Sequence, residues 1–229
     1  MARELAAGEL DDRPLQWPVR SHRVLADGNV CDFVVDEVAT PDGGSMVRQY
    51  TTHPGAVGII AWDDADRIAV VRQYRQPVAH ELIEPPAGLL DQHGEDFVVA
   101  AQRELAEEAG LAASDWRVLV DLFTTPGATQ ESVRIYLARG LSPAPRPDGF
   151  VAESEEAAME AAWAPRADLV AAVLAGRLEN PVLVAGLLAL EVARLSDGLG
   201  GLRPADAPWP ARSARDAQNE ELSRAGQPS

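Results

Sequence analysis

The sequence predicts an α/β fold that is preceded by a small antiparallel β unit. Short runs of β-forming residues, separated by turn residues, occupy much of the chain between residues 22 and 84. An amphipathic helical segment follows at 95–109, and two further helical segments lie at about 166–175 and 181–195. Strands and helices are therefore both expected in the main domain.

The antiparallel β unit is expected between His22 and Thr52. This stretch contains a hairpin turn signal, PDGG at 41–44. About three strands of this kind are marginal by themselves and leave unpaired edges. The apolar residues that need burial against something are Val30, Phe33, Val34, Val35 and Val38.

The main domain begins with strand patterns. Two apolar runs, 57–62 and 68–71, flank the polar turn 63–66 and predict a hairpin. A short strand at 81–84 ends at two prolines, which halt ladder pairing. Further strands are expected at 116–123 and 133–138.

The helix at 95–109 is bounded by glycine on both sides. Gly94 precedes it, and Gly110 follows it at the position that favours a left-handed residue. An apolar stripe marks the face that we expect to be buried: Phe97, Val98, Ala101, Leu105 and Ala109.

These elements divide the chain into three parts. Residues 1–54 comprise a loose leader and the antiparallel unit, and residues 55–198 comprise the main domain. Residues 199–229 are rich in Gly, Pro, Asp and Arg, and we expect them to form a flexible tail.

Composition excludes several classes of function. The net charge of −16, with dispersed arginines, argues against a nucleic-acid partner. Lysine is absent, which excludes Schiff-base chemistry and a lysine general base. One cysteine, Cys31, permits no intrachain disulfide, and the acidic N-terminus lacks a signal-peptide pattern. No apolar run approaches the ~20 residues that span a bilayer, so we expect a cytoplasmic protein with no membrane partner.

Three glutamates of the expected helix carry the candidate chemistry. Glu104, Glu107 and Glu108 stand at spacings i, i+3 and i+4, which place their carboxylates on one helical face. A hard divalent cation relieves the repulsion between them, and magnesium prefers carboxylate, water and phosphate oxygens. A solvated acidic face has the same spacing, so the glutamates alone leave both interpretations open.

The residues around the glutamates resemble the signature of the Nudix hydrolases, G-x5-E-x7-R-E-U-x-E-E-x-G-U, in which U is apolar. One departure lies after Gly88, where six residues precede Glu95 and the family has five. The extra residue falls in the loop before the helix, so we expect the glutamates to keep their places. The matching residues are Glu95, Arg103, Glu104, Leu105, Glu107, Glu108, Gly110 and Leu111.

The resemblance implies an α/β/α sandwich with a mixed sheet, and an enzyme that uses Mg²⁺, with Mn²⁺ as a substitute. Glu104 and Glu108 would be the principal metal ligands, with Glu107 at a further metal ion. The carbonyl of Ala87 is an additional implied ligand, and the extra residue puts its placement in question. Arg103 would pair with a carboxylate, and Glu95 would start the helix, where the dipole favours negative charge.

Three features resemble the ADP-ribose pyrophosphatase branch of this family. Arg72 and Arg75 close a strand, and Glu84 lies in the segment that leads into the signature. Gly127 ends a Thr-Pro-Gly turn after the signature, where that branch has proline. The N-terminal β unit matches the dimer-forming segment of the branch. The resemblance implies substrate contacts from Arg72, Arg75, Glu84 and Gly127, although surface arginines and Pro-Gly turns also occur without such a function.

The resemblance also implies that a mobile loop after the sheet supplies the base that activates water. The matching loop is 151–156, in which Glu153 and Glu155 are equal candidates. No histidine is well placed by pattern, and no spacing indicates a zinc site.

The implied reaction is hydrolysis of ADP-ribose to AMP and ribose 5-phosphate by a homodimer that exchanges its N-terminal units. One alternative is a Nudix pyrophosphatase for another nucleoside diphosphate sugar or a dinucleotide. Another is a non-catalytic ADP-ribose sensor, which would be expected to lose carboxylates that are all present here. A monomer whose β unit packs on its own domain is the alternative to the dimer.

Overall fold

The computed structural model describes residues 2–92, 94–146 and 159–225, and it confirms the expected fold class. The chain forms two units. The first comprises Met1–His53, Gly127–Gln130 and Trp209–Ser229, and the second comprises Pro54–Pro126 and Glu131–Pro208.

The first unit contains the expected antiparallel sheet, in the order β1-β2-β3. Its strands are β1 (Val19–Ala26), β2 (Phe33–Ala39) and β3 (Ser45–Thr51), and a short 3-10 helix, η1 (Ala7–Glu9), precedes them. Asp36 of the central strand is buried and joins all three strands. Its Oδ1 lies 2.6 Å from Nδ1 of His22, and its Oδ2 accepts a hydrogen bond of 2.8 Å from the Tyr50 hydroxyl. Burial and this hydrogen bond raise the pKa of Tyr50.

In place of the expected flexible tail, the first unit contains helix α4 (Pro210–Ala225). Polar contacts with segments far away in the sequence hold this helix. Arg215 donates a hydrogen bond of 2.8 Å to the carbonyl oxygen of His53, and Gln130 donates one of 3.1 Å to Asn219. Contacts of this type leave no hydrophobic period in the sequence, which explains why the composition alone suggested a tail.

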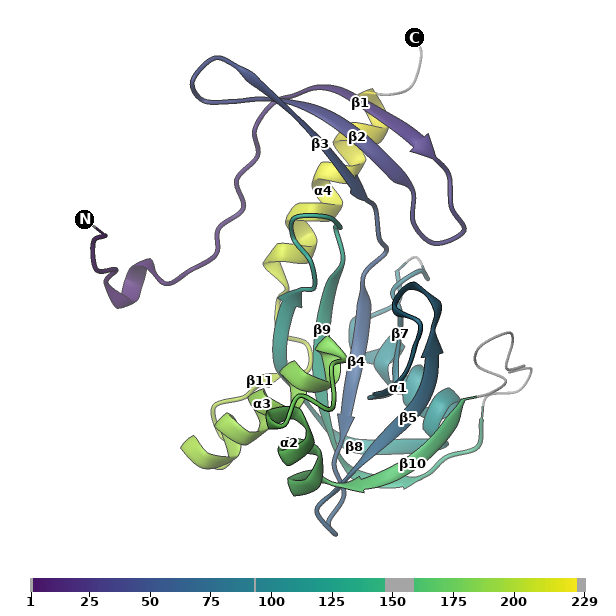
Figure 1. Ribbon diagram of the computed structural model, residues 1–229. Helices are drawn as coiled ribbons and strands as arrows, with labels where there is room; N and C mark the ends of the chain where they lie inside the picture. The colour runs from purple at the N-terminus through teal and green to yellow at the C-terminus, as the bar shows by residue number, and fades with distance from the viewer. Residues whose placement is uncertain (1, 93, 147–158, 226–229) are drawn as a thin grey trace. The chain divides into compact units, whose positions relative to one another are not determined.

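The second unit contains two sheets (Figure 1). A five-stranded mixed sheet has the order β11-β8-β9-β4-β7, and a three-stranded antiparallel sheet has the order β10-β5-β6. Among the strands of this unit that the structure describes, only β4 and β9 pair in parallel. The strands are β4 (Ala56–Ala61), β5 (Arg67–Arg75), β6 (His80–Glu84), β7 (Ala87–Leu89), β8 (Leu111–Phe123), β9 (Ser132–Pro143), β10 (Glu160–Pro165) and β11 (Arg203–Pro204); η2 (Gln76–Val78) joins β5 to β6.

The prediction that the runs 57–62 and 68–71 form a hairpin is wrong. The turn between them is present, but the two strands share only the isolated bridge Trp62–Ile68 and then enter different sheets. Both strands are buried on both faces, as runs of consecutive buried residues show: 57–61 in β4 and 68–71 in β5. A strand of this kind takes a central position between two neighbours. β4 therefore lies between β9 and β7, and β5 lies between β10 and β6.

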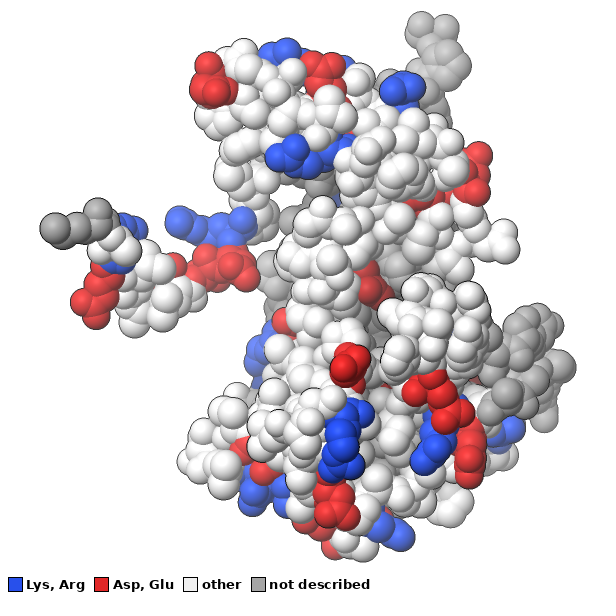
Figure 2. Space-filling model, in the orientation of Figure 1, with Lys and Arg blue, Asp and Glu red and all other residues white. Residues whose placement is uncertain are grey.

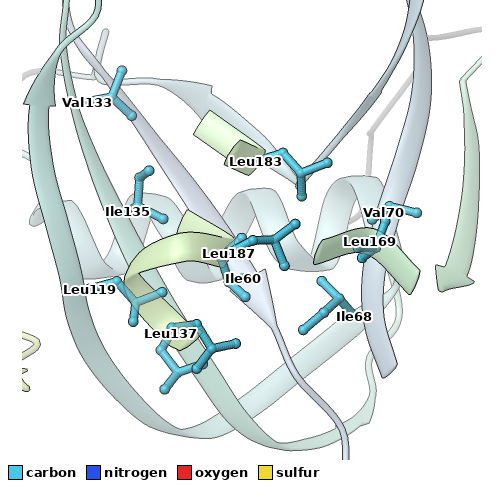
Figure 3. Packing of buried hydrophobic residues seen from close by; sticks show 11 residues of the cluster. Ile60, Ile68, Val70, Leu119, Val133, Ile135, Leu137, Leu169, Leu183 and Leu187 are labelled. Atoms are coloured by element: carbon cyan, nitrogen blue, oxygen red, sulfur yellow. The ribbon is translucent and has the colours of Figure 1, made fainter. Parts of the chain in front are cut away.

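Three helices cover the sheets of the second unit: α1 (Phe97–Ala109), α2 (Arg166–Leu174) and α3 (Pro181–Ser196). Asn180 caps α3 by accepting a hydrogen bond of 2.9 Å from the Leu183 amide. Leu183 and Leu187 of α3 lie in one buried cluster with Ile60 and Ile135 of the mixed sheet (Figure 3). Gly186 permits this close packing, because a Cβ there would lie 2.7 Å from Cγ1 of Ile60.

The second unit extends past residue 198, where the sequence placed the end of the main domain. β11 pairs with β8, and the segment after it is tied to the fully buried Arg134 of β9. Arg134 forms a two-bond ion pair with Asp121, at 2.7 and 3.0 Å. Arg203 of β11 pairs with the same carboxylate at 2.7 Å. Residues 203–208 are therefore part of this unit. No helix among the residues that the structure describes has the length and hydropathy needed to cross a membrane.

Candidate active site

Helix α1 carries the signature glutamates and is held against β7. The helix begins after Asp96 and ends at Gly110, whose φ of 63° is left-handed as expected. The carboxylate of Glu104 lies on Gly88, where a Cβ would overlap it. Glu108 accepts a hydrogen bond of 2.9 Å from the amide of Ala87. Two of the three glutamates thus contact the Ala87–Gly88 segment, with the six-residue spacer present.

Arg103 is the centre of an ion-pair network on this helix. Its guanidinium lies 2.6 Å from Glu104 and 3.3 Å from Glu107, through the same Nη1 atom. Its Nε and Nη2 donate to the two oxygens of Glu95, at 3.2 and 3.1 Å. The hydrogen bonds that Arg103 donates to Glu95, together with the negative charge of Glu104, raise the pKa of Arg103 against the opposing effect of burial. Glu95 precedes the first residue of α1, so its contact is with Arg103 rather than within the first helical turn as the sequence suggested.

The carboxylates fit a divalent cation by type and by spacing. Oxygen ligands on one helical face suit a hard ion such as Mg²⁺. In this conformation, no three His, Cys, Asp or Glu side chains among the described residues are grouped closely enough to hold an ion. Arg103 instead engages Glu104 and Glu107, and Glu108 engages the Ala87 amide. Residues at i, i+3 and i+4 are neighbours on a helix, so the three carboxylates nevertheless share one face of α1.

Three predicted substrate contacts, Arg72, Arg75 and Glu84, lie on the β5–β6 hairpin, where they take part in two ion pairs. Arg75 forms a two-bond ion pair with Glu84, at 2.9 and 2.7 Å. Arg72 lies 3.5 Å from Glu81, and both side chains of this second pair are more than half exposed. The sequence placed Arg72 and Arg75 together but missed the two glutamates as their partners. The signal that could have found them is the strand alternation across the hairpin.

The remaining predicted site residues lie elsewhere in the chain. Gly127 belongs to the first unit. The candidate bases Glu153 and Glu155 lie outside the described residues. On the face shown in Figure 2, acidic and basic side chains of the described residues are mixed, with no continuous basic surface.

The chain is similar to a known family model, to characterised proteins and to a solved structure. Residues 52–184 match the NUDIX domain model. An ADP-ribose pyrophosphatase of Mycobacterium tuberculosis is 44% identical over 189 residues, which cover 82% of this chain and 89% of that protein. An ADP-ribose pyrophosphatase of Bacillus subtilis is 38% identical over 118 residues, which cover 52% of this chain and 63% of that protein. A solved structure of an ADP compounds hydrolase is similar with a TM-score of 0.66 at 21% identity. The match covers 82% of this chain and 99% of that chain, and it supports the assignment of the fold.

Proposed function

The chain belongs to the Nudix hydrolase family, and we propose that it hydrolyses the diphosphate bond of ADP-ribose to AMP and ribose 5-phosphate with Mg²⁺ as its metal ion. Nudix hydrolases generally need a divalent metal. The observation that carries the proposal is the arrangement of Glu104 and Glu108 against the Ala87–Gly88 segment. The high identity to an ADP-ribose pyrophosphatase over most of both chains supports the choice of substrate.

The glutamates of α1 have separate tasks in this proposal. Glu104 and Glu108 hold the metal ion, Glu107 contributes to a further one, and the Ala87 carbonyl is an additional ligand. When bound, the ion supplies a Lewis acid that stabilises negative charge on the diphosphate. Arg103 is a positioning residue, because its guanidinium joins Glu104 to Glu107 and Glu95.

Substrate contacts and the base come from other elements. Arg75 of the β5–β6 hairpin supplies a cationic side chain that an acidic protein needs in order to bind an anionic diphosphate. Gly127 is a further proposed contact. The base that activates water is Glu153 or Glu155.

The proposed assembly is a homodimer that exchanges its N-terminal units. Exposed apolar side chains on the first unit support this, because such groups mark interaction surfaces when they cluster. They are Val24, Leu25, Val30, Phe33 and Val47, each at least 41% exposed in the single chain. We propose a cytoplasmic location, which suits a chain with one cysteine.

Incubation with ADP-ribose and Mg²⁺, with the products resolved, tests the function. The expected products are AMP and ribose 5-phosphate in equal amounts. A panel of other nucleoside diphosphate sugars and dinucleotides tests the alternative substrates, and the preferred one is the substrate with the highest kcat/KM. Tight binding of ADP-ribose without hydrolysis would identify a sensor and overturn the proposal.

A further inference from the structure

The β5–β6 hairpin carries two Arg–Glu pairs on opposite faces. In its antiparallel register Val71 faces Glu84, and Tyr74 faces Glu81. Because side chains alternate along a strand, Arg75 shares a face with Val71 and Glu84, whereas Arg72 shares the other face with Tyr74 and Glu81. The contacts agree with this division, since Arg75 pairs with Glu84 and Arg72 pairs with Glu81.

The two faces have different neighbours. Ile68 and Val70, which share the face of Arg72, pack into the core with Leu169 of α2 and Leu183 of α3. The opposite face of β5 carries Ala69, Val71 and Gln73, which are also buried, and then Arg75. Because β5 also contacts α1, this opposite face is the one that lies toward the helix of the signature glutamates.

Glu84 is also close in the chain to the segment that contacts those glutamates. It lies three positions before Ala87, whose amide donates to Glu108. The side chain of Glu84 is 3% exposed, whereas that of Arg75 is 42% exposed. One partner is therefore fixed in the interior, and the other is held by it at the surface.

We propose that Glu84 is a positioning residue that orients Arg75 for contact with the substrate diphosphate, and that Arg72 takes no part in substrate binding. This inference rests on the proposed function and assigns roles within it. A two-bond Arg–carboxylate pair fixes the plane of the guanidinium as well as its position. A group held in this way loses less conformational freedom when it binds a ligand.

Orientation, rather than attraction, is the effect assigned to Glu84. Its carboxylate partly cancels the charge of Arg75, so it weakens long-range attraction of an anion. Loss of Glu84 therefore has opposite consequences under the two effects. Loss of orientation raises KM, whereas loss of the negative charge lowers KM, and salt screens the second effect.

The test compares matched variants of the two pairs. The variants Glu84→Gln, Arg75→Lys and the double variant are measured beside the control variants Glu81→Gln and Arg72→Lys. Values of kcat and KM for ADP-ribose are taken at low and at high ionic strength. We expect KM to rise about tenfold in Glu84→Gln and in Arg75→Lys, with kcat within about twofold of the original. The double variant should be no worse than the poorer single variant, because the two residues act as one unit. The control variants should stay within about twofold in both constants.

Three results would overturn the inference: a lower KM for Glu84→Gln at low salt, additive effects in the double variant, or an equal rise in KM in the control variants. Arg75→Lys leaves a cation beside the buried carboxylate, so it keeps the test decisive if Glu84→Gln does not fold. Failure of the proposed function is distinguishable, because the unaltered protein would then fail to hydrolyse ADP-ribose. In that case the same comparison is made with the diphosphate that the panel identifies.

Discussion

Arg134 donates a hydrogen bond of 2.7 Å to the carbonyl oxygen of Ala207, although 73 positions separate them. Arg134 is fully buried, and Asp121 provides its charge partner. The pair fixes residues 203–208 on the sheet, in a part of the chain whose composition suggested a tail.

We predict that Asp121→Asn destabilises the protein, because it leaves the buried guanidinium of Arg134 without its carboxylate. The free energy of unfolding should fall by about 3 kcal/mol, as when one partner of a buried ion pair is removed. Denaturant unfolding measures this. Asp115→Asn is the matched control, since Asp115 pairs with Arg117 at the surface, and its change should stay within about 0.5 kcal/mol. Equal changes in the two variants would contradict the prediction.

We predict that hydrolysis requires a divalent metal ion and that glutamates of α1 bind it. Chelation of divalent ions should abolish activity, and Glu104→Gln and Glu108→Gln should each lower turnover on the order of a hundredfold or more, because each removes a ligand charge. Steady-state kinetics with ADP-ribose and Mg²⁺ measures the loss. Near-normal rates in both variants would move the catalytic centre away from this helix.

The base is predicted to be one of two glutamates that precede β10. Either Glu153→Gln or Glu155→Gln should lower kcat on the order of a hundredfold or more, with little change in substrate affinity. The two variants act as controls for each other, since they differ only in position. If both keep full activity, the base lies elsewhere, and Glu107 is the next candidate.

Assembly is predicted to depend on the N-terminal residues. Deletion of residues 1–52 should give a protein that is monomeric or insoluble and that binds ADP-ribose poorly, because strands β1 to β3 are removed. Sedimentation of the full-length and truncated proteins measures the change. A truncated protein that stays a soluble dimer with intact affinity would exclude the exchange of N-terminal units.

Acid is predicted to remove the stability that Arg166 provides. Arg166 pairs with Asp66 at 2.7 Å and also with Glu191, so it joins the β4–β5 turn to α3. The hydrogen bond from Arg166 lowers the pKa of Asp66. Burial raises the pKa of Glu191, but hydrogen bonds from Arg194 and Arg166 outweigh it and lower the pKa overall. Carboxyl groups whose pKa falls on folding add stability at neutral pH, and this stability is lost as the pH falls through their folded-state pKa.

The variant Arg166→Gln tests whether the stability provided by Arg166 is lost as the pH falls. The difference in free energy of unfolding between it and the original protein should be large at pH 7 and should shrink below about pH 4, where carboxylates protonate. Arg117→Gln, at a surface pair, should show little difference at either pH. A difference that is constant across this range would show that Arg166 acts through packing instead.

Local patterns in the sequence were sufficient for the helix of the candidate site. The spacing of Glu104, Glu107 and Glu108 depends only on helical geometry, and Gly110 ends the helix because glycine adopts a left-handed φ without strain. The strands of the N-terminal sheet were predictable for a similar reason, since a hairpin turn signal lies between two of them.

Contacts between distant segments were decided only by the tertiary structure. The sequence placed Arg72 and Arg75 in one group, and the register of β5 with β6 puts them on opposite faces. It suggested a tail after residue 198, where polar bonds from Arg134 and Arg215 hold the segment after β11 and helix α4. The sequence shows which strands are buried and where turns occur. It does not show which strands become neighbours, because that depends on which distant groups pair with their charges and hydrogen-bonding groups. That choice is made in three dimensions, which is why the helix of the candidate site was predictable and the glutamate partners of Arg72 and Arg75 were not.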